Sequence, residues 1–192
     1  MKVELFVPCI IDQFFPLVAS HTMKVLERAG VEVEYNPEQT CCGRFAYQAG
    51  FMEEAKELGD KFLHDFSYDG PVVAPSAVCV HYIRTHYPEL FFNTANHLNF
   101  KKMVANIYEL TDFLVNKLHF DDFGAEFPYK VTFHDSCSAL RGMGLARFRN
   151  DDPQSMLLTG TGCKAIPVPS EAAMKVLDEY FAWRRGQEIP IR

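Results

Sequence analysis

The stretch KVELFVPC, residues 2–9, decides the fold that the sequence predicts. Its mixture of β-branched and aromatic residues is typical of a buried strand, and this strand leads directly to Cys9. A helix is expected over residues 16–29, where the apolar positions have helical spacing and Gly30 is a natural stop. The chain therefore begins with a strand followed by a helix.

The same order recurs twice in the residues that follow. VEVEY, residues 31–35, alternates like a strand, and a charged amphipathic helix is expected near residues 51–66. GPVVAPS, residues 70–76, predicts a third strand, and VCVHYIRTHY, residues 78–87, predicts the next helix. Alternating strands and helices favour an α/β fold with a mainly parallel sheet flanked by helices.

Cysteines follow the three predicted strands. Cys9 follows the first strand, Cys41 and Cys42 follow the second, and Cys79 follows the third. Because ligands of open α/β sheets gather outside the carboxyl ends of the strands, these four cysteines are expected at one edge of one sheet.

Four thiolates are soft ligands that suit an iron–sulfur cluster or zinc. Gly43 lets the backbone approach such a site closely. The neighbours Cys41 and Cys42 reach two irons of a cluster more readily than one tetrahedral ion, which favours iron–sulfur. Two alternatives remain open: a zinc-binding structural protein, and a thiol-redox protein in which Cys41 or Cys42 attacks a disulfide.

Composition limits the function classes. The 192 residues suit one large domain or two small lobes, and the net charge of −6 argues against a nucleic-acid partner. No apolar run reaches the roughly 20 residues of a membrane helix, and the first residues lack a secretory signal. A cytosolic location is therefore expected, where cysteines serve as metal ligands or redox thiols more often than in disulfides.

A weak internal repeat predicts two related lobes. KVTFHDSC, residues 130–137, resembles KVELFVPC, with its cysteine at the same offset from the lysine. The predicted division is a first cysteine-rich lobe over residues 1–87, a helical connector over 88–128 with a helix at 104–118, and a second lobe over 129–192. The second lobe is shortened, and around Ala172 and Ala173 it lacks a cysteine pair of its own.

Several motifs resemble the cysteine-rich CCG domain family. They are LFVPCIIDQFFP, QTCCGRFAYQAGF, VVAPSAVCVHYIRTHYPELF, YELTDFLV and VTFHDSCSALRGMG. This family is shared by a cysteine-rich component of heterodisulfide reductase, the iron–sulfur subunit of glycolate oxidase and lactate utilization protein A. The resemblance covers nearly the whole chain and is strongest for the lactate utilization type.

The resemblance implies an electron-transfer subunit with a 4Fe–4S-type cluster, acting with flavin or iron–sulfur subunits of a complex that oxidises L-lactate or glycolate. By motif, Cys9, Cys41, Cys42 and Cys79 match the ligands, and Cys137 matches the first cysteine of the second motif. The family's second Cys-Cys-Gly is missing. Tyr82 stands where heterodisulfide reductase has the last cysteine of its first motif.

Four residues beside these cysteines are further candidates. Gly43 and Arg44 follow the cysteine pair, and Arg44 is either a source of positive charge that stabilises thiolates or a solvated side chain. Ser76 precedes Cys79 and suits a helix cap, and His134 lies near Cys137 as a candidate hydrogen-bond donor to a metal ligand. The sixth cysteine, Cys163, is expected to be a small apolar residue.

Overall fold

The computed structural model describes residues 1–66, 70–120, 122–124 and 136–145. Its elements are β1 (Lys2–Leu5), α1 (Cys9–Phe14), α2 (Pro16–Arg28), β2 (Glu32–Glu34), α3 (Arg44–Gln48), α4 (Met52–Asp65), β3 (Val72–Ala74), α5 (Ala77–Phe91), α6 (His97–Asn106), β4 (Ile107–Glu109), α7 (Leu110–Asp112) and the π-helical turns η1 (Phe113–Lys117) and η2 (Ser138–Gly142). The predicted α/β class is confirmed.

The strands form one parallel sheet in the order β2-β1-β3-β4. In register, Val3 pairs with Val33 on one side of β1, and Leu5 pairs with Val73 on the other. The chain therefore runs outward from β1 to β2 and then returns to β3 on the opposite side. This reversal between β1 and β3 is a topological switch point, where the carboxyl ends of the strands leave a crevice.

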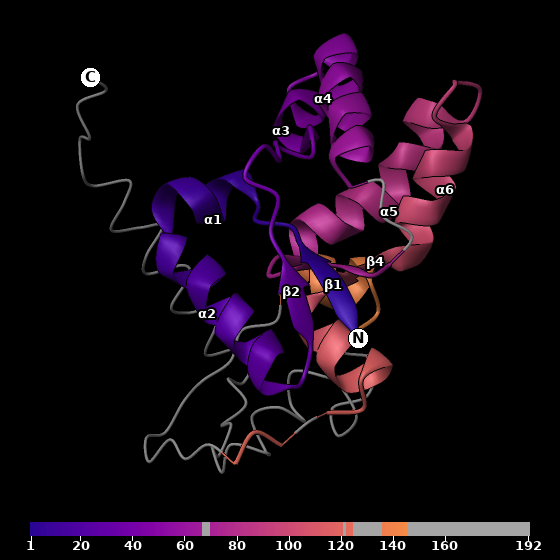
Figure 1. The fold of residues 1–192 in the computed structure, drawn as a ribbon. Helices are drawn as coiled ribbons and strands as arrows, with labels where there is room; N and C mark the ends of the chain where they lie inside the picture. The colour runs from indigo at the N-terminus through magenta and orange to yellow at the C-terminus, as the bar shows by residue number, and fades with distance from the viewer. Residues whose placement is uncertain (67–69, 121, 125–135, 146–192) are drawn as a thin grey trace, which may run out of the picture.

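Helices cover both faces of the sheet (Figure 1). On one face, Val3, Leu5 and Val73 pack with Leu26 of α2 and Phe113 of η1. On the other face, side chains from the sheet pack with α4, α5 and α6, including Phe6, Phe62, Ile83, Phe100 and Ile107. Successive strand residues thus point to opposite apolar layers, as expected for a sheet buried on both sides.

The predicted helix over residues 104–118 is wrong at residues 107–109, between the end of α6 and the start of α7. Residues Ile107–Glu109 form β4, which pairs with β3, and Arg84 donates hydrogen bonds from its guanidinium to the Ile107 carbonyl oxygen. Ile107 and Glu109 are buried and Tyr108 is half-buried. A strand of three residues is too short to break helical spacing in the sequence, so pairing with β3 decides the conformation.

Three other helices also differ from the prediction. The short helices α1 and α3 had no predicted counterpart, and α5 continues through Pro88 to Phe91. Proline removes a helical hydrogen bond, but the buried Tyr87 and Phe91 hold this last turn against the core. The proposed division at residues 87 and 128 stays a prediction, because most of the second lobe lies outside the described residues.

Within the described part, no helix combines the length and hydrophobicity needed to cross a membrane.

Candidate metal centre

The four cysteines lie where the chain leaves the carboxyl ends of β1, β2 and β3. Cys9 opens α1 after β1, Cys41 and Cys42 lie between β2 and α3, and Cys79 lies in the first turn of α5 after β3. Because β1 and β3 flank the switch point, Cys9 and Cys79 approach it from its two sides. The structure thus brings together the four cysteines singled out in the sequence, while their role as ligands stays a prediction.

The four thiols interact with one another. The Cys9 and Cys41 sulfurs are 3.4 Å apart, and Cys42 interacts with Cys41 and Cys79 closely enough to shift the pKa values of all three thiols. Cys42 and Cys79 are buried, whereas Cys9 and Cys41 are half-buried. The sulfurs therefore follow one another in the order Cys9, Cys41, Cys42, Cys79, with the outer end open toward solvent.

The interactions among the thiols shift their pKa values in opposite directions. The hydrogen bond from Cys42 lowers the pKa of Cys41 to about 5, with support from the Gly43 backbone N–H, Cys9 and Arg44. The hydrogen bond from Cys42 likewise lowers the pKa of Cys79. Burial raises the pKa of Cys9 to about 11, and hydrogen bonding to Cys41 and Cys79 raises that of Cys42 well above its usual value. The pKa shifts of the four thiols therefore run in opposite directions, downward for Cys41 and Cys79 and upward for Cys9 and Cys42.

Long-range hydrogen bonds hold the loop that carries the cysteine pair. The Gln39 side chain accepts from the Val7 N–H at 2.7 Å and donates to the Leu5 carbonyl oxygen at 3.2 Å. On the other side, the Tyr87 hydroxyl donates to the Cys42 carbonyl oxygen at 3.0 Å. The loop is therefore fastened to β1 and to α5, the two elements that lead to Cys9 and Cys79.

Gly43 is required by the shape of this loop. Its φ of +86° lies in the left-handed region, and a Cβ atom there would lie 2.7 Å from the Ala55 carbonyl oxygen. Any side chain would therefore push the cysteine pair away from α4. The predicted close approach of the backbone is present, and the neighbour is the helix α4.

Arg44 and Ser76 both act on the thiolates electrostatically. The Arg44 charge lowers the pKa of Cys41 and Cys79, while its Nη1 donates to Gln48 at 2.7 Å. Ser76 is the N-cap residue of α5, but its side chain makes no capping bond. After Cys42, the Ser76 side chain is a further group that lowers the pKa of Cys79.

The candidates from the second motif are less closely placed. Cys137 is exposed at the amino end of η2, which packs against His81 of α5 at Gly142. No hydrogen bond joins Cys137 to another cysteine among the described residues, and its role as a cofactor ligand stays a prediction. His134 and Cys163 lie outside the described residues.

Three buried donors beside the cysteine pair have no hydrogen-bond acceptor among the described residues. They are the Thr40 hydroxyl, the Nε of Arg44 and the Tyr82 hydroxyl. Buried polar groups are nearly always paired, so a concentration of unpaired donors indicates an acceptor that is not a protein atom. The sulfurs of an anionic cluster are acceptors of this kind, and the residues present therefore fit an iron–sulfur group.

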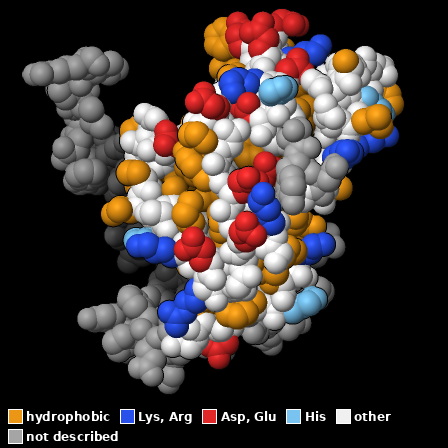
Figure 2. Space-filling view, viewed as in Figure 1, with side chains coloured by type: hydrophobic (Ala, Val, Ile, Leu, Met, Phe, Trp, Pro, Cys, Tyr) orange, Lys and Arg blue, Asp and Glu red, His pale blue; other side chains and the backbone are white. Residues whose placement is uncertain are grey.

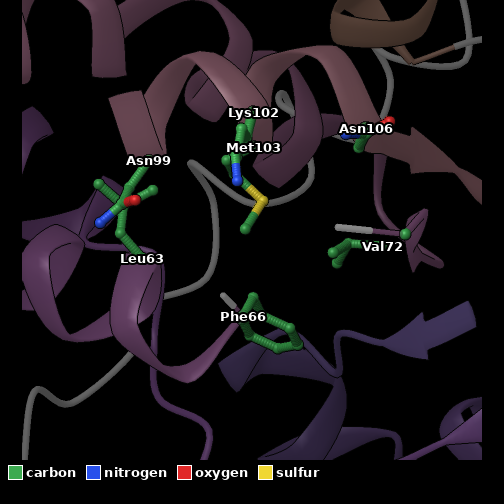
Figure 3. A pocket seen from close by; sticks show the side chains of 8 residues that line it. Leu63, Phe66, Val72, Asn99, Lys102, Met103 and Asn106 are labelled. Atoms are coloured by element: carbon green, nitrogen blue, oxygen red, sulfur yellow. The ribbon is translucent and has the colours of Figure 1, made fainter. Parts of the chain in front are cut away.

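Two cavities differ sharply in what they can hold. A hollow of about 200 Å³ opens beside Cys9 and Cys41 and is lined also by Asp12, Tyr35 and Thr40. A second cavity, between α4, α6 and the amino end of β3, encloses only about 10 Å³ next to Phe66 and Met103 (Figure 3). The second holds at most a water molecule, so the cysteine edge is where a cofactor has room.

As the side chains stand in the described ranges, no three or more His, Cys, Asp or Glu residues are arranged around a single point that could hold one metal ion. The cysteines interact pairwise instead, through the Cys9–Cys41 contact and the influence of Cys42 on Cys41 and Cys79. Sequence reasoning missed Thr40, Gln39 and Tyr87. Thr40 directly precedes the cysteine pair and could have been noted, whereas nothing in the sequence signals that Tyr87 reaches Cys42.

Comparison with known proteins adds a family context. The model of the CCG cysteine-rich domain matches residues 3–84, the part that contains the four cysteines. The lactate utilization protein A of Geobacillus thermodenitrificans is 37% identical over 171 residues, which cover 88% of this chain and 70% of that protein. The protein of the same name from Bacillus subtilis is 36% identical over 172 residues, covering 89% and 70%.

Proposed function

Because the chain belongs to the lactate utilization protein A family, with its cysteine-rich CCG domain, we propose that it is an iron–sulfur electron-transfer subunit of a system that oxidises a 2-hydroxy acid. The relatives' names support lactate as the acid, and glycolate is the close chemical alternative. The observation that carries the proposal is the set of four interacting thiols beside three unpaired donors.

The proposed ligands are Cys9, Cys41, Cys42 and Cys79. A cluster of the 4Fe–4S type, when bound, supplies reversible storage of one electron. Only thiolates bind iron, and the pKa of Cys41, lowered to about 5, already favours that form, while the pKa of Cys79 is shifted in the same direction. Cys9 and Cys42 hold their protons in the metal-free protein, so binding releases protons from these two residues.

The chain's other residues prepare this edge for an anion. Arg44 contributes positive charge that lowers the pKa of Cys41 and Cys79, and the Ser76 side chain also lowers the pKa of Cys79. Burial of Cys42 and Cys79 excludes water from the inner half of the site, while Cys9 and Cys41 face the open hollow. Electrons would enter or leave through this open side.

A partner protein is part of the proposal, because an electron carrier must meet both a donor and an acceptor. Large apolar side chains are exposed on α1, which begins at Cys9, and on the start of α2: Phe14 is 73% exposed, Phe15 58% and Leu17 69%. Figure 2 shows hydrophobic side chains over these two helices, whereas acidic ones gather over α4. An apolar surface next to the open side of the site supports docking of a flavin or iron–sulfur protein there.

The proposal is tested by spectroscopy on protein purified without oxygen. We expect broad visible absorption that bleaches on reduction with dithionite, and a signal in electron paramagnetic resonance (EPR) of the reduced protein. Cys42→Ser should lose both, while Cys163→Ser, a change outside the proposed ligands, should keep both. A colourless wild-type protein that holds about one zinc would contradict the proposal and support the structural alternative.

The physiological acid requires a test in the source organism. Deletion of the gene should slow growth on L-lactate, and the wild type or Cys163→Ser should restore it, whereas Cys42→Ser should not. A growth defect on glycolate alone would identify glycolate as the substrate of the system. Normal growth on both acids would contradict the proposed role.

A thiol-redox role is the second candidate, because the low pKa of Cys41 and its 3.4 Å contact with Cys9 suit a nucleophilic thiol with a resolving partner. Oxidation of wild-type protein by a small disulfide should then produce a Cys9–Cys41 disulfide, detected by peptide mass spectrometry. Persistence of both as free thiols after iron is removed would exclude this role.

A further inference from the structure

Tyr82 is held rigidly beside the cysteine edge. It lies on α5 one turn after Cys79, and its side chain is buried, with 3% exposed. Its ring contacts that of Tyr47 at 5.4 Å, that of His86 at 5.5 Å and, edge to face, that of Tyr87 at 5.8 Å. With neighbours on three sides, the ring cannot turn its hydroxyl toward solvent.

The Tyr82 hydroxyl nevertheless has no hydrogen-bond partner among the described residues. The neighbouring hydroxyls are committed as donors elsewhere. That of Tyr47 donates to Glu89 at 3.2 Å, and that of Tyr87 donates to the Cys42 carbonyl oxygen at 3.0 Å. A buried, unpaired hydroxyl is unfavourable, so this one indicates an acceptor supplied by a ligand.

The surroundings of the hydroxyl identify the ligand's position. Tyr82 belongs to the same buried cluster as Cys42 and Cys79, against which Cys41 packs, and its ring contacts that of Tyr87, whose hydroxyl bonds the Cys42 carbonyl oxygen. The hydroxyl is therefore near the Cys41–Cys42 pair, yet it bonds to neither sulfur. An acceptor placed between the phenol and the pair would satisfy it.

We propose that the Tyr82 hydroxyl donates a hydrogen bond to an inorganic sulfide of the cluster held by the four cysteines, and so makes that cluster easier to reduce. This inference rests on the proposed function. Tyr82 is then a positioning residue that tunes the reduction potential of the cluster, while the four thiolates bind the cluster.

The effect on reduction follows from charge. An added electron increases the negative charge on the sulfurs, and a hydrogen bond to a more negative acceptor is stronger. Such a donor therefore stabilises the reduced form more than the oxidised form, and hydrogen bonds to the sulfurs are among the factors that set cluster potentials. Removing the donor should make reduction harder.

Tyr82→Phe tests this, because it removes the hydroxyl and keeps the ring packing. We expect the variant to hold as much iron and sulfide as the wild type, with a midpoint potential that is more negative. A roughly tenfold loss in the reduction equilibrium, on the scale of one charge-assisted hydrogen bond, equals about 59 mV for one electron. Tyr47→Phe is the matched control, because the Tyr47 hydroxyl bonds Glu89. The midpoint potential of this variant should match that of the wild type.

A second readout identifies the bond itself. In the reduced wild type, electron–nuclear double resonance should show a proton coupling that disappears in deuterated water. The coupling should be absent in Tyr82→Phe and present in Tyr47→Phe. The same coupling in all three proteins would overturn the assignment to Tyr82.

The remaining outcomes separate this inference from the proposed function. Cluster-loaded Tyr82→Phe with an unchanged potential would overturn the inference and leave the proposed function standing. Failure of a folded Tyr82→Phe, with wild-type circular dichroism, to hold the cluster would assign Tyr82 to cluster retention and overturn the tuning role. A wild-type protein without iron and sulfide would overturn both.

Discussion

The Tyr87 hydroxyl donates a hydrogen bond to the carbonyl oxygen of Cys42 at 3.0 Å, and both residues are buried. This bond joins the helix that carries Cys79 to the loop that carries the cysteine pair. The backbone beside the cysteines is thereby fixed before any cofactor binds. The proposed ligands are thus preorganised by contacts between residues far apart in the sequence.

Tyr87→Phe should destabilise the protein by about 1–3 kcal/mol, because the Cys42 carbonyl oxygen is left buried without its partner. The free energy of unfolding, measured with urea, checks this. Tyr108→Phe is the control, since its hydroxyl is at an exposed site and bonds weakly, at 3.5 Å, so a change within about 0.5 kcal/mol is expected. Equal effects of the two substitutions would show that the bond to Cys42 does not matter.

Gly43→Ala should destabilise the protein more than Gly50→Ala. Both glycines have a φ of +86°, so both substitutions carry the left-handed strain of roughly 1–2 kcal/mol. Only at Gly43 would the new Cβ meet the Ala55 carbonyl oxygen, at 2.7 Å, whereas nothing lies within 4 Å at Gly50. Thermal unfolding of both variants separates the contact from the strain. Equal losses would mean that α4 moves aside freely.

In metal-free protein under reducing conditions, Cys41 should react with iodoacetamide well below the pH at which an ordinary thiol reacts. Its pKa of about 5 leaves it a thiolate at neutral pH, whereas Cys9, with a pKa of about 11, stays protonated. Peptide mass spectrometry after brief alkylation from pH 4 to 9 measures this. Cys42→Ala should move the Cys41 midpoint upward, because Cys42 supplies the main hydrogen bond. Equal alkylation of Cys9 and Cys41 at every pH would contradict the predicted order.

The contribution of Glu109 to the free energy of unfolding should fall as pH rises above about 4.5, the ordinary pKa of a glutamate side chain. Burial raises the Glu109 pKa in the folded state, so the folded state binds this proton more tightly than the unfolded state. Its stabilising contribution is complete below the unfolded pKa and is lost as pH rises through the folded pKa. Glu109→Gln should remove that dependence, which urea unfolding at pH 4.5 and pH 7 will show. Parallel profiles of variant and wild type would contradict the assignment to Glu109.

The sequence predicted the parallel sheet and the meeting of the cysteines because both depend on short-range patterns. A strand followed by a cysteine and then a helix recurs three times, and parallel strands place their carboxyl ends together. The family resemblance was also confirmed, by the domain match and by the lactate utilization relatives.

Other features depend on tertiary contacts that no local pattern records. β4 is a strand because Ile107–Glu109 pair with β3, although the spacing around it is helical. Pro88 stays in a helix because Tyr87 and Phe91 are buried. The burial of Tyr82 follows from the rings packed around it, and a tyrosine in the sequence gives no indication of whether its hydroxyl finds a partner.

The most direct test of the central claim is chemical analysis of iron and acid-labile sulfide in protein purified without oxygen. The account predicts iron and sulfide in equal amounts, bound in the wild type and lost in Cys9→Ser, Cys41→Ser, Cys42→Ser and Cys79→Ser. Cys163→Ser should retain the wild-type content, and Cys137→Ser will show whether that residue contributes. Wild-type protein that carries no sulfide, even after anaerobic reconstitution with iron and sulfide, would contradict the account.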